Sequence, residues 1–206
     1  MRSRDNTARR ALPQQARSRA TVEQIFQTSL KLLEECGVDA FNTNLLAERA
    51  GLSPRAIYRY FPNKWTILIA LAERVRQHER EWIGDLSGLT TGDDWRETLR
   101  HAIFDYYDAA ARETGYRALR AASELTPELR EHDRQANLAV QKELSIGLRS
   151  LGAMADDIEI DALSCVVIET SNRVIDIALL SDQMVARQLL TVLHNMIGDL
   201  LSRYLK

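Results

Sequence analysis

Cationic and phenolic side chains gather in one short stretch of this 206-residue chain, between Pro54 and Lys64. Helical spacing across this stretch buries Ile57 and Phe61 on one side. The polar side chains left facing outward or sideways are Arg55, Tyr58, Arg59 and Tyr60. An arginine can fork onto a guanine edge or hold a phosphate, and a tyrosine hydroxyl donates to phosphate oxygens. The stretch therefore has the chemistry of a nucleic-acid contact.

The residues before and inside this stretch predict a helix, a tight turn and a second helix that runs to about residue 60. Apolar residues at helical spacing end at Ala50, and Gly51 tolerates the left-handed backbone that closes a helix. Ser53 and Pro54 then form a strong helix start, which leaves only Gly51 and Leu52 between the helices. This is the pattern of a helix-turn-helix. Helix pairs with surface arginine and tyrosine also occur in proteins that never bind DNA, so the pattern alone leaves that alternative open.

A third helix is expected from Asn63 to about Ile83. Asn63 is suited to cap this helix, and Lys64 follows it directly. The lysine charge and the free amides of the helix N-terminus are thus expected to hold one phosphate together.

Several segments match a known family in order and spacing. They are Ile25 to Gly37, Phe41 to Thr43, Leu46-Ala47, Ala50 to Ser53 and, as the strongest signature, Tyr58 to Lys64. Through them the stretch from Ala16 to about Leu71 resembles the N-terminal domain of the TetR (tetracycline repressor) family of bacterial transcriptional regulators.

The resemblance implies a role for individual residues of this domain. Phosphate contacts fall on Thr43, Tyr58, Tyr60 and Lys64, and contacts to bases or nearby phosphates fall on Arg55 and Arg59. The full expected DNA-binding set is Thr43, Ser53, Pro54, Arg55, Ala56, Tyr58, Arg59, Tyr60 and Lys64. The family often has glycine at position 55 and threonine at position 56, so the DNA sequence read by this chain cannot be borrowed from relatives.

Charge and composition predict three parts: a flexible basic arm over 1–15, a helix-turn-helix DNA-binding domain over 16–65, and an effector-binding and dimerisation domain over 66–206. The total charge is −2, but residues 1–65 carry +5 and residues 66–206 carry −7. A basic head on an acidic body suits phosphate binding. The arm holds Arg2, Arg4, Arg9 and Arg10, and it is interpreted either as a DNA-contacting arm or as a solvated tail without a role.

Several other classes of protein are disfavoured by the sequence. There is no 18-residue apolar run for a membrane span, and no apolar segment follows the N-terminal charges as in a signal peptide. The histidines lack metal-ligand spacing, and neither a phosphate-binding glycine loop nor a nucleophile elbow is present. We therefore expect no enzyme activity, catalytic residue, metal or cofactor, and a cytoplasmic, nucleoid-associated location. Cys36 and Cys165 are predicted to be reduced core residues.

The body reads as helices with short joints, so the predicted fold class is all-α: a three-helix helix-turn-helix head joined to a larger helical bundle, about nine helices in all. One helix is expected to start at Asp94 and to carry residues 99 to 110, and Gly115 should end it. Further helices are expected at 116–125, 126–151, 158–180 and 183–204. No strand alternation is evident.

The last two helices carry more apolar positions than one core-facing stripe needs. Ser181 and Asp182 join them tightly, so an antiparallel hairpin is expected, and two copies would form a four-helix interface about a two-fold axis. The residues expected at this dimer interface are Val166, Val174, Ile177, Leu189, Leu193, Met196, Ile197 and Leu200. The alternative is that these helices are buried inside one protomer.

The family resemblance also implies a small-molecule pocket among the middle helices of the body. The candidate residues are Tyr106, Tyr107, Tyr116, Arg120, Asn137, Glu169, Asn172, Arg173 and Asp176. A buried polar group needs a partner, which a ligand can provide. The competing interpretation is that Glu169 and Arg173 simply pair with each other at i, i+4 on a wet face, and that the tyrosines belong to the core.

These expectations combine into one functional hypothesis. The chain is expected to be a ligand-responsive repressor that binds a near-palindromic double-stranded DNA site as a homodimer and is released by a small-molecule effector, without membrane association. The alternative is a chromosome-anchored scaffold that uses the same head on DNA and the body on a protein partner. An enzyme is the weakest hypothesis.

Overall fold

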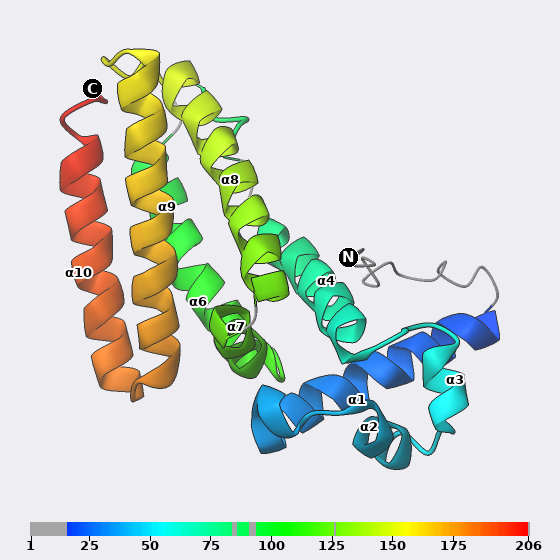
Figure 1. Cartoon of the computed structure of the whole chain (residues 1–206). Helices are drawn as coiled ribbons and strands as arrows, with labels where there is room; N and C mark the ends of the chain where they lie inside the picture. The colour runs from blue at the N-terminus through cyan, green and yellow to red at the C-terminus, as the bar shows by residue number, and fades with distance from the viewer. Residues whose placement is uncertain (1–15, 84–85, 91–93, 126, 206) are drawn as a thin grey trace. The chain divides into compact units, whose positions relative to one another are not determined.

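The computed structural model describes residues 16–83, 86–90, 94–125 and 127–205. Every regular element among these residues is helical, and they form nine continuous helical segments, which confirms the predicted all-α fold (Figure 1). The chain divides into two compact units. Unit 1 comprises residues 1–75 and 114–132, and unit 2 comprises residues 76–113 and 133–206. The predicted basic arm, 1–15, lies outside the described residues.

Unit 1 contains the predicted helix-turn-helix. Its elements are α1 (Ala16–Ala40), α2 (Thr43–Arg49), α3 (Pro54–Tyr58), the first part of α4 (Lys64–Ile83), α7 (Tyr116–Leu125) and the start of α8 (Pro127–Ser150). The core of the unit is made of fully buried aliphatic and aromatic side chains, which include Ile25, Leu33, Phe41, Leu46, Ile57, Phe61 and Leu68. These residues come from the first four helices and, for Phe41 and Phe61, from the joints between them, so the apolar stripes read from the sequence face one another as expected.

Helix α7 packs on α1 within unit 1. At the joint before α7, Gly115 has a φ of 73°, and a Cβ placed there would lie 2.7 Å from the carbonyl oxygen of Leu30. Tyr116 follows with 1% of its surface exposed. The predicted break at Gly115 is confirmed, and the glycine also lets the two backbones approach closely.

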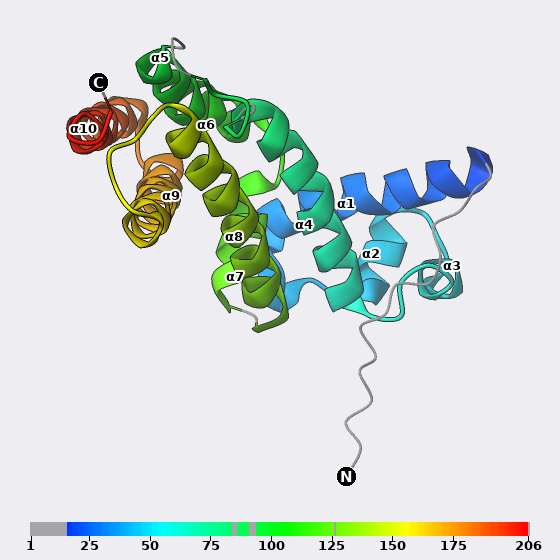
Figure 2. The ribbon, with the colours of Figure 1, turned by 90° about the horizontal axis from the view of Figure 1, so that it is seen from above.

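Unit 2 is built from the rest of α4 and α8 together with the later helices. These are α5 (Trp95–Arg100), the π-helical segment η1 (His101–Asp105), α6 (Tyr106–Arg112), α9 (Asp157–Leu180) and α10 (Gln183–Leu201). Figure 1 and Figure 2 both show α9 and α10 side by side as an antiparallel hairpin. Asp182 caps α10 by accepting hydrogen bonds from the amides of Met184 and Val185, so the predicted joint is confirmed.

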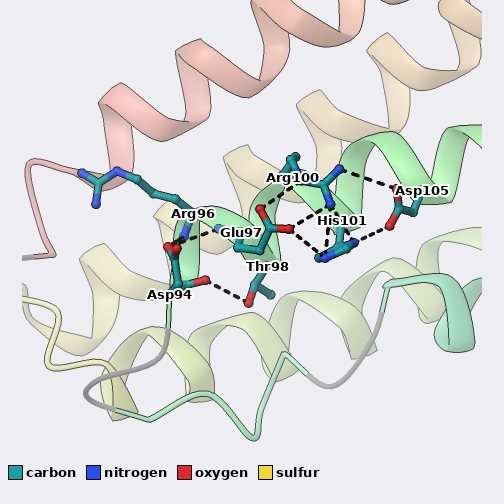
Figure 3. A network of polar contacts seen from close by, with 7 residues as sticks. All are labelled: Asp94, Arg96, Glu97, Thr98, Arg100, His101 and Asp105. Atoms are coloured by element: carbon teal, nitrogen blue, oxygen red, sulfur yellow. Dashed lines mark hydrogen bonds and ion pairs between the residues drawn. The ribbon is translucent and has the colours of Figure 1, made fainter.

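The segment from Trp95 to Arg112 is one continuous helix with a π-helical turn, η1, in its middle. We expected a single regular α-helix here. Figure 3 shows the polar side chains along this turn: Arg100 donates to both carboxylate oxygens of Glu97 at 2.9 Å, and His101 lies between Glu97 and Asp105. All four side chains are between 42% and 52% exposed, so these pairs add little stability individually.

Both cysteines are free and exposed, so their assignment to the core was wrong. On α9, Ser164 and Val167 face the interior, and Cys165 lies one residue away from that buried stripe. Cys36 lies near the end of α1, where its thiol donates to the carbonyl of Leu32. Among the described helices, none is both long and apolar enough to cross a bilayer.

Gly147 of α8 allows a second close approach, because a Cβ there would lie 1.9 Å from the carbonyl oxygen of Leu86. Gly147→Ala is therefore expected to lower the free energy of unfolding by about 2 kcal/mol, although alanine is the better helix former. Denaturant unfolding measures this change. The matched control is Gly198→Ala in α10, where no atom lies within 4 Å of the added Cβ, and which should raise the stability by about 0.5–1 kcal/mol. Equal changes in the two variants would contradict the close contact.

Candidate nucleic-acid interface

The turn between α2 and α3 is closed by backbone hydrogen bonds around Gly51, whose φ is 61°. The amide of Leu52 donates to the carbonyl of Ala47 at 2.9 Å, and the amide of Gly51 donates to that of Glu48 at 3.1 Å. This pair of bonds is a Schellman motif, which needs a left-handed residue at the position of Gly51. The predicted role of the glycine is confirmed.

Helix α3 begins as the sequence predicts. The Ser53 hydroxyl accepts a hydrogen bond from the amide of Ala56, and Pro54 occupies the first turn. Ile57 is fully buried and Phe61, just after the helix, is 1% exposed. The helix is only five residues long, so its orientation depends on this burial and on its caps.

The other side of α3 is open to solvent. Arg55, Tyr58 and Arg59 are exposed, with 42% of Tyr58 accessible, and Tyr60 is half-buried beside the Arg59 guanidinium. The structure thus brings the predicted arginines and tyrosines together on one short helix and its C-terminal end. Of the remaining members of the set, Ser53 and Pro54 are exposed and Ala56 is half-buried.

Two predicted phosphate contacts from different helices meet directly. The hydroxyl of Thr43, the first residue of α2, lies 2.9 Å from the hydroxyl of Tyr58 on α3. The Asn42 side chain caps α2 by accepting from the amides of Asn44 and Leu45, and it donates to the carbonyl of Ala40. The corner before α2 is therefore held by a dense set of local hydrogen bonds.

Lys64 lies in a different environment from the one expected for an open phosphate contact. The residue is half-buried, and its ammonium donates to the carbonyls of Val38 and Phe41, each at 3.1 Å. The same ammonium is 4.7 Å from the centre of the Trp65 ring. The predicted cap beside it is confirmed, because the Asn63 side chain accepts from the amide of Thr66 at 3.0 Å.

Sequence reasoning missed two side chains of α1 that bond to other parts of unit 1. Gln24 donates from Nε2 to the carbonyl of Ala50 at 2.7 Å, which satisfies a backbone acceptor inside the α2–α3 turn. Glu23 forms an ion pair with Arg74 of α4. Both bonds join residues far apart in the sequence, so helical periodicity could not have identified them.

The candidate effector residues lie in several separate places. Tyr116 and Arg120 are on α7 in unit 1, whereas the other seven belong to unit 2. Asn137 and Glu169 come together, because Glu169 accepts hydrogen bonds from Asn137 at 3.4 Å and from the buried Gln141 at 3.0 Å. These hydrogen bonds join α8 to α9 through Glu169. The sequence had suggested only a pair between Glu169 and Arg173 within α9.

The tyrosines are core residues, as the competing interpretation held. Tyr106 and Tyr107 are buried. The Tyr106 hydroxyl donates to Glu79, and Arg187 lies over the Tyr107 ring at 5.7 Å. On α9, Asn172 and Asp176 are half-buried and Arg173 is exposed.

A charged cluster that the sequence did not reveal surrounds Tyr106 in unit 2. Arg76 of α4 pairs with Asp133 of α8 and lies 3.8 Å from Glu79, and all three side chains are largely buried. Arg76 and Asp133 lie 57 residues apart in the sequence, so helical spacing could not bring them together. No group of three or more metal-ligating side chains is gathered anywhere in the part of the chain that the structure describes.

The α9–α10 hairpin exposes an apolar face. Val166, Ile177 and Met196 are between 41% and 55% exposed, while Val174, Leu189 and Leu200 are half-buried. Leu193 and Ile197 are each 1% exposed and pack inside the protomer, so their assignment to the dimer interface was wrong. Large apolar residues of the same hairpin that the prediction missed are exposed instead, namely Ile158, Leu180, Met184, Val185 and Val192.

Comparison with known proteins identifies the family. Residues 25–71 match the family model described as bacterial regulatory proteins, tetR family. Tetracycline repressor protein class C of Escherichia coli is 30% identical over 142 residues, which cover 65% of this chain and 59% of that protein. The class A protein from transposon 1721, also of Escherichia coli, is 36% identical over 100 residues, which cover 45% of this chain and 44% of that protein.

Solved structures extend the likeness to nearly the whole chain. SmeT in complex with triclosan has a TM-score of 0.70 at 19% identity, covering 91% of this chain and 92% of that one. A TetR-family transcriptional regulator from Streptomyces coelicolor has a TM-score of 0.65 at 23% identity, covering 90% and 99%. These likenesses show the fold. The match over 25–71 and the tetracycline repressor relatives identify the N-terminal segment as a domain of the TetR family of bacterial regulatory proteins.

The ion pair between Glu23 and Arg74 predicts a pH dependence of stability. The hydrogen bond from Arg74 holds the pKa of the Glu23 carboxyl below its ordinary value. The pair therefore stabilises the fold above the ordinary pKa of a glutamate, and this contribution is lost as the pH falls through the lowered pKa. Because Glu23 is 47% exposed, the contribution should be only about 0.5 kcal/mol.

Unfolding by urea at about pH 7 and about pH 3 tests this expectation. Glu23→Gln should lower the stability at the higher pH and leave it unchanged at the lower one. Glu34→Gln, at an exposed glutamate of the same helix, is the control. A loss in Glu23→Gln that is the same at both pH values would contradict the ion pair.

Proposed function

We propose that the protein is a transcriptional regulator that binds double-stranded DNA as a homodimer and releases it when a small-molecule effector binds. The observation that carries the proposal is the exposed face of α3, which presents Arg55, Tyr58 and Arg59 within the segment that matches the TetR family model. The proposed function is binding and release, with no catalytic step.

The proposed contacts follow from the exposure of each side chain. Arg55 and Arg59 extend from α3 with the reach and the donors to fork onto a guanine edge or a neighbouring phosphate. Tyr58 and Thr43 present two hydroxyls 2.9 Å apart, which suits them to share one phosphate oxygen. Tyr60 contributes a third hydroxyl at the end of the helix, and Ser53, Pro54 and Ala56 form the helix start that approaches the groove.

A homodimer is proposed from the apolar face of α9 and α10. Val185, Val192 and Met196 on α10 follow one stripe at spacings of seven and four residues, and 44–58% of each is exposed in the protomer. A second copy related by a two-fold axis would cover this stripe and form a four-helix interface. Paired heads about 34–36 Å apart then match successive major grooves of a near-palindromic site.

Regulation by a small molecule is proposed from the relatives. The two curated relatives described above are named tetracycline repressor proteins, and SmeT was solved with triclosan. In this chain the seam between α8 and α9 carries Asn137, Gln141 and Glu169, which are joined by hydrogen bonds, and Asn172, Arg173 and Asp176 continue along α9. An effector that binds better to one arrangement of the body shifts the population away from the DNA-binding form by its differential affinity.

The functional division proposed is DNA binding by residues 16–65 and effector binding and dimerisation by residues 66–206. Residues 114–132 belong structurally to unit 1, so Tyr116 and Arg120 fit the effector role least well. A regulator bound to bacterial DNA would act at the nucleoid in the cytoplasm. The scaffold alternative is not favoured, since the relatives are repressors.

Selection of DNA fragments by the purified protein tests DNA reading. Arg55→Ala should reduce the preference for the selected site over mixed-sequence DNA by about 1–3 kcal/mol, because one bidentate base contact is lost. Binding isotherms on both DNAs measure the ratio. Arg112→Ala, which removes the same charge from the exposed surface of α6 in unit 2, should leave the ratio unchanged. Equal losses on both DNAs in Arg55→Ala would assign Arg55 to the phosphates instead.

Sedimentation velocity at micromolar concentration tests the dimer. Val192→Glu places a charge on an apolar position that is 58% exposed in the protomer, and it should convert the dimer to a monomer that keeps its helical content. Ile146→Glu, at a 50% exposed apolar position of α8, should remain dimeric. A wild-type protein that sediments as a monomer would remove the basis for paired recognition.

A further inference from the structure

We propose that Gln24 of α1 is a positioning residue, which holds the turn between α2 and α3 and thereby improves the discrimination of α3 between bases. The hydrogen bond that does this lies within unit 1, so it stands on the structure of that unit alone. Its consequence for DNA binding rests on the proposed function.

The side-chain amide of Gln24 reaches a carbonyl that belongs to the turn. Its Nε2 donates to the carbonyl oxygen of Ala50 at 2.7 Å, from a position 26 residues away in the sequence. Ala50 is the C-cap of α2, and its carbonyl is part of the peptide that leads into Gly51, whose φ is 61°. The last carbonyls of a helix have no partner within that helix. Gln24 supplies a partner, so the bond fixes the orientation of the first peptide of the turn.

The backbone that carries Gln24 is itself held in place. Ile25 and Phe26, the next two residues of α1, are 0% and 8% exposed and belong to the core of unit 1. Glu23, the residue before, forms an ion pair with Arg74 of α4. One turn of α1 therefore bonds both to α4 and to the α2–α3 turn, and it provides a fixed base from which Gln24 holds the turn.

The orientation of α3 depends on contacts from outside the helix. The helix has only five residues, and Ile57 is the one that it buries. A single buried side chain fixes where a short helix packs, but it restrains the tilt of the helix about that point less well. The tilt therefore also depends on the path of the chain through Gly51 and Leu52, which starts at the peptide that Gln24 holds.

The strength of the bond suits a positioning role better than a stabilising one. Gln24 is exposed, so water can replace the bond when it breaks, and the net contribution of such a bond is at the low end of the usual range. Removing it should increase local opening of the turn about threefold. Global unfolding should stay close to that of the wild type, because the buried apolar core of unit 1 is unchanged.

A loosened turn should affect base reading more than phosphate contacts. Arg55 forks onto a guanine edge only when two of its donors are in line with two acceptors, so a small tilt of α3 weakens this contact. Contacts to phosphates carry no sequence information and are made from several elements. The preference for the selected site over mixed-sequence DNA should therefore fall, with a smaller change in affinity for mixed-sequence DNA. A residue that only stabilised unit 1 would leave the preference of the folded protein unchanged.

The experiment compares Gln24→Met, Gln24→Lys and Gln27→Met in the full chain. Methionine keeps the length of the side chain without a donor, and lysine keeps a donor of sufficient reach. The matched control is Gln27, which is exposed on the same helix and donates to Glu23 within α1. Amide hydrogen exchange is followed at Gly51 and Leu52, whose amides close the turn. Gln24→Met should exchange about threefold faster at both, and the other two variants should match the wild type.

Binding isotherms on the selected site and on a mixed-sequence duplex measure the preference as a ratio of two affinities. Gln24→Met should lower this ratio about threefold, in step with the faster exchange. Gln24→Lys and Gln27→Met should keep the wild-type ratio, and any gain in affinity from the lysine charge acts on both duplexes alike.

Equal exchange in Gln24→Met and Gln27→Met would overturn the role of the hydrogen bond in the turn. Faster exchange in Gln24→Met with a wild-type ratio would show that the bond only stabilises the turn, and it would overturn the positioning role. A wild-type chain that selects no DNA would refute the proposed function. Exchange at Gly51 and Leu52 would still decide whether Gln24 holds the turn.

Discussion

The burial of Ile57 is the interaction on which the reading head depends. Helix α3 has five residues, too few to be stable in water without tertiary contacts. Ile57 is fully buried among the apolar residues of unit 1, and Phe61 anchors the chain directly after the helix. Because these two side chains point into the core, Arg55, Tyr58 and Arg59 lie on the opposite side of the helix and face solvent. The cap at Ser53 and the turn at Gly51 determine where the helix begins. The caps and the buried side chains together determine the directions of Arg55, Tyr58 and Arg59.

Around that core, polar bonds from neighbouring helices limit how α2 and α3 can move. Gln24 of α1 holds the carbonyl of Ala50 at one end of α2, and Lys64 of α4 holds the carbonyls of Val38 and Phe41 before the other end. Glu23 and Arg74 join α1 to α4 in the same unit. In unit 2, Arg76, Glu79 and Asp133 form a largely buried set of charges with Tyr106. Such a cluster adds little net stability. A shift of α4 along α8 that separated Arg76 from Asp133 would leave buried charges unpaired, which is strongly destabilising.

The sequence predicted best what local chemistry determines. Gly51, Ser53 and Pro54 act through their own backbone and their nearest neighbours, so the turn and the start of α3 follow from residue type. The π-helical turn at His101–Asp105 was missed because apolar spacing does not distinguish it from a regular helix. On α9 and α10 the sequence revealed the apolar residues but not which of them face outward. Leu193 and Ile197 pack inside the protomer, and Val192 beside them is exposed. The hydrogen bonds of Lys64 reach carbonyls more than twenty residues away, which no short motif records.

Gly115 shows how two independent restrictions can meet at one position. Its left-handed backbone alone would still admit asparagine, the residue other than glycine that adopts this conformation most readily. The carbonyl of Leu30, 2.7 Å from where a Cβ would lie, removes that option as well. Every substitution of Gly115 should therefore destabilise the protein. The packing of α7 against α1 fixes the path of the chain through this joint, and only glycine fits that path.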